Sequence, residues 1–149
     1  MAQVLLLLSG PNLNLLGDRE PDVYGTDTLD DHVVAATARA ARYGLEVEHV
    51  QSNAEADLVD AVHGARGRAA AIVVNAGALT HYGWSLHDAL AAYDGPIVEL
   101  HLSNPDRREP WRHTSVVSPV ATGLISGFGG HGYRLAVDAV AELLGITVA

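Results

Sequence analysis

The stretch VLLLLSGPNLNLLGDREPDVYG, from Val4 to Gly25, decides the fold. Its first five residues, Val4 to Leu8, are apolar without alternation, which is typical of a strand buried on both faces of a parallel sheet. Gly10 and Pro11 end this strand, and polar residues follow at once. Ligands of open α/β sheets bind beyond the carboxyl ends of the strands. We therefore expect the loop that follows to carry function.

The rest of the chain alternates between helical and strand patterns. Further strands are expected at Leu45–Val50, Ala70–Val74, Pro96–Leu100 and Thr122–Ser126. Helices are expected from a capping box at Thr28 and Asp31 to Gly44, from a similar pattern at Ser52–Glu55 to Ala65, from Thr80 to Tyr93, and from Tyr133 to Leu144. This alternation predicts a parallel sheet with helices on both faces. The expected fold is a flavodoxin-like three-layer α/β sandwich with strand order 2-1-3-4-5, made by residues 1–149 as one domain.

Composition excludes several classes of protein. The formal net charge of −9 disfavours binding to nucleic acid and to anionic membranes. No apolar run is long enough to span a membrane, and no leader is recognisable, so we expect a cytoplasmic protein. Cysteine is absent, which removes disulfides and thiol nucleophiles. All nine basic residues are arginines, so no lysine side chain can form an imine with a ketone.

Known cofactor and metal motifs fit the sequence poorly. Gly127, Gly129 and Gly132 match the dinucleotide-binding spacing, but no further strand follows to supply the acid that binds a ribose. A glycine-rich turn is the better interpretation. The eight histidines show no pairing typical of a metal site, and His81 and His87 fall on different helical faces. We therefore expect neither a bound metal nor a nucleotide cofactor.

Polar side chains follow three of the expected strands. Asn12 comes after the first strand, Asn75 after the third and His101 after the fourth. Glu99 lies two residues before His101, so both side chains point to the same side of an extended strand. A carboxylate there can hold the imidazole in one orientation and favour its protonated form. The alternative is a carboxylate that merely satisfies its own hydrogen bonds near the strand end.

A second group of candidates lies in the first loop and the fourth helix. Tyr24 could act as a base only if a cation favoured its ionised form, because a phenol in water loses its proton near pH 10. Arg19, on the same loop, could supply that charge, and Arg112 is a second candidate. His81 and Asp88 lie two turns apart on one face of the expected helix, too far apart to share one small ligand. Asp88 is therefore expected to reach the site of a neighbouring subunit.

Several motifs together resemble one enzyme family. They are GPNLNLLGDREPDVYG from Gly10, QSN-x-E from Gln51, N-x-GA-x-TH from Asn75, E-x-HLSN from Glu99, RE-x-WRH-x-S from Arg108, and GY at Gly132. The chain resembles type II 3-dehydroquinate dehydratase over nearly its whole length. That resemblance implies a flavodoxin-like fold, a dodecamer built from four trimers, and no metal or cofactor. It also implies anti elimination of water from 3-dehydroquinate to 3-dehydroshikimate, a step of the shikimate pathway that also occurs in quinate breakdown.

The resemblance assigns a role to each candidate residue. Tyr24 would be the tyrosinate that removes the proton beside the ketone, and Arg19 would keep it ionised. Asn12 would hold a water against the enolate oxygen. His101, oriented by Glu99, would protonate the departing hydroxyl. The implied substrate contacts are Asn75, His81, Arg112, the backbone near Leu102 and Ser103, and Asp88 from the adjacent subunit.

None of the main departures from the family pattern replaces one of these residues. They are Ala76, Leu79, the run Tyr82 to Trp84, Thr114, and the run Ala54 to Ala56. They affect the expected shape of the wall near His81. The runner-up hypothesis is a flavodoxin-like module that binds a small ligand without catalysis. Such a module would have no use for an arginine and a tyrosine on a loop between glycines.

Overall fold

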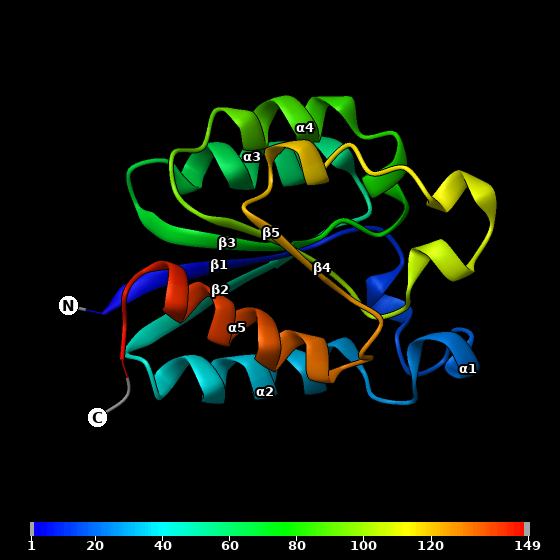
Figure 1. Cartoon of the computed structure of the whole chain (residues 1–149), viewed down its shortest axis with the longest axis horizontal. Helices are drawn as coiled ribbons and strands as arrows, with labels where there is room; N and C mark the ends of the chain where they lie inside the picture. The colour runs from blue at the N-terminus through cyan, green and yellow to red at the C-terminus, as the bar shows by residue number, and fades with distance from the viewer. Residues whose placement is uncertain (1, 148–149) are drawn as a thin grey trace.

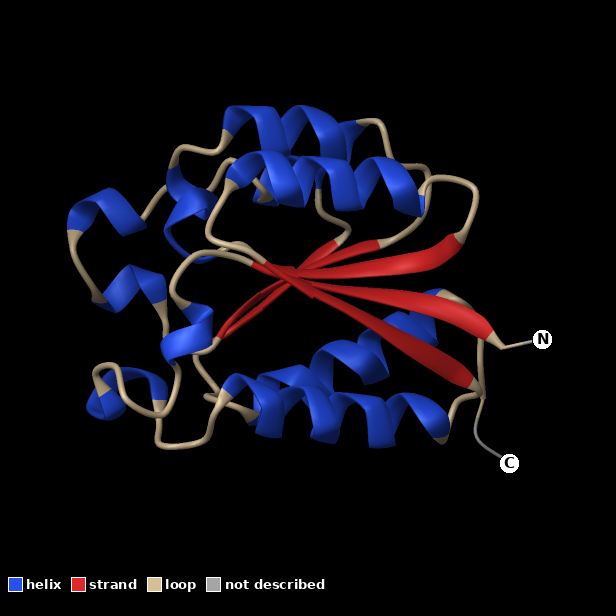
Figure 2. Ribbon diagram, turned by 180° about the vertical axis from the view of Figure 1, so that it is seen from behind, coloured by secondary structure: helices blue, strands red, loops and turns tan. Residues whose placement is uncertain are grey.

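The structure, a computed structural model that describes residues 2–147, is a five-stranded parallel sheet between two layers of helices (Figures 1 and 2). The strand order β2-β1-β3-β4-β5 confirms the predicted topology. Each observed strand falls within one or two residues of its prediction. The strands are β1 (Gln3–Ser9), β2 (Leu45–Gln51), β3 (Ala69–Asn75), β4 (Ile97–His101) and β5 (Gly123–Ser126).

Four longer helices cover the sheet, two on each face. α2 (Leu29–Ala41) packs with α5 (His131–Leu143) on one face, and α3 (Glu55–Ala65) packs with α4 (Trp84–Ala91) on the other (Figure 2). The short helix α1 (Pro21–Tyr24) and three of the 3-10 turns, at 13–15, 105–107 and 110–112, gather beyond the carboxyl ends of the strands. No helix within residues 2–147 combines the length and the apolar content needed to cross a membrane.

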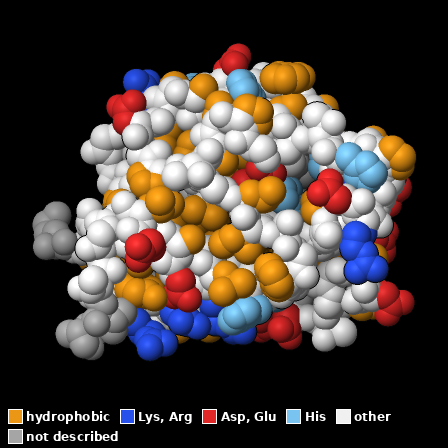
Figure 3. Space-filling model, in the orientation of Figure 1, with side chains coloured by type: hydrophobic (Ala, Val, Ile, Leu, Met, Phe, Trp, Pro, Cys, Tyr) orange, Lys and Arg blue, Asp and Glu red, His pale blue; other side chains and the backbone are white. Residues whose placement is uncertain are grey.

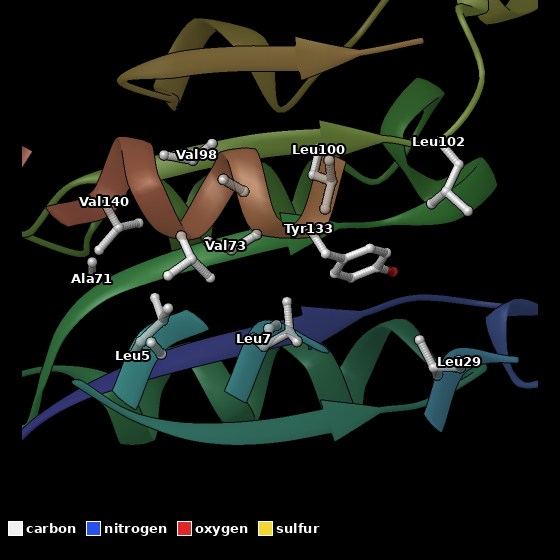
Figure 4. Packing of buried hydrophobic residues seen from close by; sticks show 14 of the residues in the cluster. Leu5, Leu7, Leu29, Ala71, Val73, Val98, Leu100, Leu102, Tyr133 and Val140 are labelled. Atoms are coloured by element: carbon white, nitrogen blue, oxygen red, sulfur yellow. The ribbon is translucent and has the colours of Figure 1, made fainter. Parts of the chain in front are cut away.

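The strand β1 contributes to both hydrophobic cores, which explains its unbroken apolar run. Leu5 and Leu7 point into the core beneath α2 and α5, whereas Leu6 and Leu8 point into the core beneath α3 and α4. Successive side chains of a strand point to opposite faces, so a strand covered on both faces needs an apolar residue at every position. Figure 4 shows the first of these cores, with Leu5 and Leu7 facing Val73.

Of the four predicted helix starts, the capping box of α2 is confirmed and α5 begins two residues before its prediction, whereas the starts of α3 and α4 differ from their predictions. Thr28 and Asp31 form the expected capping box at α2, with side-chain to backbone bonds of 3.1 and 3.0 Å. Ser52 and Glu55 do not form one, because Ser52 bonds Ala54 N and Asp57 instead. The carboxylate of Glu55 accepts from the backbone N–H of Leu86, 3.0 Å away at the start of α4.

The second wrong start concerns the helix expected from Thr80. Residues 77–81 form a 3-10 helix, and α4 begins only at Trp84, after a break at Tyr82 and Gly83. Gly83 packs so closely against the Leu79 carbonyl that a Cβ atom would lie 2.7 Å from its oxygen. His81 and Asp88 therefore do not share one helical face, and the prediction that they do is wrong.

The loops after β1 and β3 touch each other. The order of the strands along the sheet reverses between these two strands. Gly10 N donates to Asn75 O at 2.8 Å. A Cβ atom on Gly10 would lie 2.3 Å from the backbone oxygen of Ala76, and one on Gly77 would lie 2.8 Å from Pro11 O. Only glycine permits this approach. The contact brings the loop that starts at Asn12 beside the loop that follows Asn75.

We predict that Gly10→Ala destabilises the fold, because the clash is with backbone that cannot move without separating β1 from β3. The expected loss is about 1–3 kcal/mol in the free energy of unfolding, measured by urea denaturation. Gly64→Ala is the matched control, since a Cβ atom on this glycine of α3 meets nothing within 4 Å. The control should keep or raise stability by up to about 1 kcal/mol. Equal stability of the two variants would contradict the argument.

Candidate active site

A polar cavity lies beyond the carboxyl ends of β1, β3 and β4, beneath α1. Its volume is about 50 Å³, which is room for only a few water molecules. The predicted site residues that line it are Asn12, Arg19, Tyr24, Asn75, His81, His101, Leu102, Ser103 and Arg112. Arg108 also lines it, although the sequence did not single this residue out. The first-loop residues reach the cavity because α1 folds back over the strand ends.

His101 and Glu99 form a buried pair at the end of β4. His101 Nε2 lies 2.6 Å from Glu99 Oε2, so this nitrogen carries the proton that it donates to the carboxylate. Glu99 lies behind His101, away from the cavity that contains Tyr24, and also accepts hydrogen bonds from Ser115 and Ser118. Burial opposes the ionisation of Glu99, but the bonds from His101 and the two hydroxyls outweigh it and lower the pKa of the carboxyl. The ring of His101 is thus held by an anion.

Tyr24 is buried beneath two guanidinium groups. The Cζ atoms of Arg19 and Arg108 lie 4.8 and 5.0 Å from the centre of its ring. The local fold that brings Tyr24 here is unusual, because Glu20 has a φ of 40° and Pro21 then starts the single turn of α1. A non-glycine residue in the left-handed region is uncommon and is often found at functional sites. The chain therefore uses a strained turn to place Tyr24 at the cavity.

Arg108 joins the first loop to the loop after β4. Its Nη1 donates to Ser103 Oγ at 3.2 Å, and its Nη2 lies 3.8 Å from the Glu20 carboxylate. Its side chain is only 14% exposed, which separates it from an ordinary surface arginine. Its place within the family-like motif was the only sequence signal for it. Spacing could not reveal it, because its partners Glu20 and Tyr24 lie on a loop more than eighty residues earlier in the chain.

His81 and Arg112 form the wall of the cavity near the 3-10 turns. His81 Nδ1 lies 2.7 Å from Thr114 O and therefore donates to it, which leaves Nε2 of a neutral ring as an acceptor. Burial lowers the pKa of His81, so the neutral ring is favoured. Arg112 stacks on Trp111 at 4.0 Å and bonds Glu109 at 2.6 Å. The side chain of Arg112 is only 13% exposed, unlike that of a solvated surface arginine.

Two asparagines complete the cavity. Asn12 has a φ of 68°, and its N–H donates to Asn53 Oδ1 at 3.0 Å. Asparagine tolerates this left-handed backbone better than most residues. Asn75 is buried, and its Oδ1 accepts from Gly77 N at 3.3 Å.

Asp88 does not join the other candidates. It lies on α4 with its side chain exposed, and it does not line the cavity of its own chain. Within residues 2–147, no three His, Asp or Glu side chains are arranged to hold a metal ion. Tyr133 is the other buried tyrosine near the strand ends, and burial raises its pKa to about 12. It stays protonated, so among the buried tyrosines near this edge Tyr24 is the better candidate for a base.

The arrangement suits proton transfer to and from one small molecule. A tyrosine beside two cations and a histidine held by a carboxylate face the same cavity. The first can accept a proton as tyrosinate, and the second can donate one as imidazolium. Asparagine, histidine and serine side chains around them can bind hydroxyl groups. Arginine side chains can bind a carboxylate.

Known proteins share both the sequence and this fold. The family described as "Dehydroquinase class II" matches residues 3–141. A 3-dehydroquinate dehydratase of Corynebacterium glutamicum is 55% identical, over 93% of this chain and 96% of that protein. A 3-dehydroquinate dehydratase 2 of Pseudomonas putida is 51% identical, over 97% of each chain.

A solved structure agrees with these relatives. The type II dehydroquinase from Propionibacterium acnes superposes with a TM-score of 0.90 at 40% identity, over 95% of this chain and 98% of that one. The relatives and the family match cover almost the whole chain, so the expected family is confirmed. The chain belongs to the class II dehydroquinase family.

Proposed function

We propose that this chain is a 3-dehydroquinate dehydratase in which Tyr24 is the base and His101 the acid of an anti elimination. The observation that carries the mechanism is the placement of Tyr24 under two guanidinium groups, in one cavity with a histidine held by Glu99. The family and the relatives support the activity and the substrate. One base and one acid suffice for this reaction, so we propose that it proceeds without a metal or a cofactor.

The first step removes a proton from the carbon beside the ketone. Tyrosinate Tyr24 takes this proton, and the electron pair of the C–H bond moves towards the ketone to form an enolate. Arg19 and Arg108 attract the negative charge on the phenolate oxygen. Asn12, just beyond the carboxyl end of β1, is proposed to hold a water that donates a hydrogen bond to the enolate oxygen.

The second step expels the hydroxyl group from the next carbon. As the enolate collapses, the C–O bond breaks and imidazolium His101 transfers its proton to the leaving oxygen, so that water departs. Glu99 keeps the proton on Nε2, which leaves Nδ1 as the position that donates. The double bond forms between the two carbons and is conjugated with the ketone.

The remaining polar residues suit a hydroxylated ring with one carboxylate. The protein has a net charge of −9, yet three arginines and two histidines line this cavity. We propose that Asn75 and His81 bind substrate hydroxyls. Arg112 and the backbone of Leu102 and Ser103 are proposed to contact the rest of the molecule, including its carboxylate.

Assembly is the part of the proposal that involves other subunits. We propose a homododecamer, a tetramer of trimers, in the cytoplasm. Leu124 on the edge strand β5 and Phe128 just after it are more than half exposed, and hydrophobic side chains gather on the face around β5 (Figure 3). Exposed apolar patches of this kind mark contacts between chains. Asp88, exposed on α4, is proposed to complete the site of a neighbour.

Tyr24→Phe should abolish turnover while substrate binding stays intact, because the ring remains and the proton acceptor is lost. Mixing wild-type protein with 3-dehydroquinate should produce the ultraviolet absorbance of a conjugated enone. In the variant we expect kcat to fall by about 10²–10⁴-fold with little change in KM. Tyr43→Phe is the matched control and should keep full activity, because Tyr43 lies in the turn between α2 and β2, at the opposite end of the sheet from the cavity. If folded wild-type protein produces no enone absorbance, the proposed function is wrong. Full turnover in Tyr24→Phe would show that another group is the base.

Residues 18–25 should act as a lid, because this polar segment lies between two glycines and carries Arg19 and Tyr24 to the cavity. In the free protein we expect trypsin to cut early after Arg19. A non-reacting analogue of 3-dehydroquinate should slow this cut several-fold. Cleavage after Arg42, an exposed residue at the end of α2, is the internal reference and should not change. Equal cleavage after Arg19 with and without the analogue would argue against a lid.

Asp88 should be shared between subunits, because it lies outside the cavity of its own chain. Subunits carrying Tyr24→Phe and subunits carrying Asp88→Ala are each expected to be inactive or weak. After subunit exchange, some mixed interfaces pair an intact Tyr24 with a neighbour's intact Asp88, and activity should reappear. Mass spectrometry of the intact assembly verifies the exchange and gives the number of subunits. Absence of recovery despite exchange would remove Asp88 from the neighbour's site.

A further inference from the structure

The carboxylate of Glu99 is surrounded by hydrogen-bond donors other than the histidine that the mechanism uses. Oε2 accepts from His101 at 2.6 Å and from Ser115 Oγ at 2.9 Å, and Oε1 accepts from Ser118 Oγ. Glu99 itself is only 1% exposed. Both serines come from the segment that follows the 3-10 turn at 110–112, not from the strands beside Glu99. The proposed proton transfers do not involve these two hydroxyl groups.

Two hydroxyl donors have a definite effect on a buried carboxyl group. A hydroxyl that donates to a carboxylate stabilises the ionised form, whereas a protonated carboxyl must itself find an acceptor. Burial alone would raise the pKa of Glu99, yet the bonds from His101, Ser118 and Ser115 lower it. The donors also leave the carboxylate little freedom to rotate, so the direction of its bond to His101 is fixed.

The two serines differ in their other contacts. Ser115 Oγ accepts from the backbone N–H groups of Val117 and Ser118, at 3.1 and 3.0 Å, and so shapes the turn between them. Ser118 Oγ has Glu99 as its hydrogen-bond partner, and the rest of the residue is exposed. Removing the Ser118 hydroxyl therefore tests the bond to Glu99 without breaking the turn.

Both serines lie on the far side of His101 from the cavity that contains Tyr24. Together with Glu99 they line a second cavity of about 240 Å³. The charged and titratable groups that face Glu99 there are His81 and His101, Asp106 of the 3-10 turn at 105–107, and Arg112 and His113. A change at Ser118 leaves all of these groups in place. It also leaves the walls around the substrate unchanged, since Ser118 does not line that cavity.

We propose that Ser118, supported by Ser115, is a positioning residue that holds the Glu99 carboxylate and, through it, the ring of the acid His101. This inference rests on the proposed function, in which His101 protonates the leaving hydroxyl. Without the Ser118 bond, Glu99 takes up a proton more easily and turns more freely. His101 then loses the fixed anion that holds the orientation of its ring.

Ser118→Ala should lower kcat about tenfold and leave KM unchanged. The ratio of wild-type to variant activity should grow as the pH falls, because the pKa of Glu99 rises when a donor is lost. Ser118→Thr keeps a hydroxyl at the same place and should restore most of kcat. Ser126→Ala is the matched control, since Ser126 lines the same second cavity without a hydrogen bond to Glu99 among the described residues.

An infrared titration measures Glu99 without relying on turnover. The band of a protonated buried carboxyl is assigned to Glu99 by its loss in Glu99→Gln. In Ser118→Ala this band should appear at a pH about one unit higher than in the wild type. An unchanged titration would overturn the proposal whatever happens to kcat. If the band shifts but kcat does not change, Ser118 holds Glu99 without affecting the action of His101, and the proposal is overturned. If wild-type protein produced no enone, the proposed function would fail while the titration still decided the role of Ser118.

Discussion

The buried carboxylate of Glu99 is the constraint on which the geometry of the site depends. A charge within a sheet is costly unless donors surround it, and Glu99 lies between the apolar residues Val98 and Leu100 of β4. Three side chains donate hydrogen bonds to the Glu99 carboxylate. One is His101, two residues further along β4, and the others are two serines from the segment that leads into β5. That segment must therefore cross the end of β4 closely, and the same crossing brings Arg108 and Arg112 to the cavity. The carboxylate thus organises more than its own histidine.

A parallel sheet explains why the rest of the chemistry lies at one edge. The central strands β1, β3 and β4 are covered on both faces, so their interiors have almost no room for polar side chains. Polar residues appear at the last positions of these strands or directly after them. Because parallel strands end at the same edge, Asn12, Asn75 and His101 meet there although they are far apart in the sequence. The tight approach of Gly10 to Ala76 sets the spacing between the first two of them.

The sequence was enough to predict the five strands, their order and the pairing of Glu99 with His101, because these follow from apolar runs and a period of two. It was not enough where a long-range contact replaces a local one. Glu55 looks like half of a capping box, yet it bonds Leu86 thirty-one residues later. Arg108 and Ser118 carried no local pattern, and their partners Glu20, Tyr24 and Glu99 become visible only when the loops are placed in space. The roles of the site residues stay predictions in either case.

The distribution of charge links these contacts to the proposed chemistry. A chain with twice as many acidic as basic residues repels anions overall, yet four of its nine arginines, Arg19, Arg107, Arg108 and Arg112, lie on the two loops beside the cavity. Three of them line it. In the proposed mechanism, closure of the lid would remove water from this space, so each of these charges would act more strongly on a phenolate or an enolate than in solvent. The buried Glu99 has a second consequence: its carboxylate places a negative charge directly behind His101, in a cavity that three arginines line.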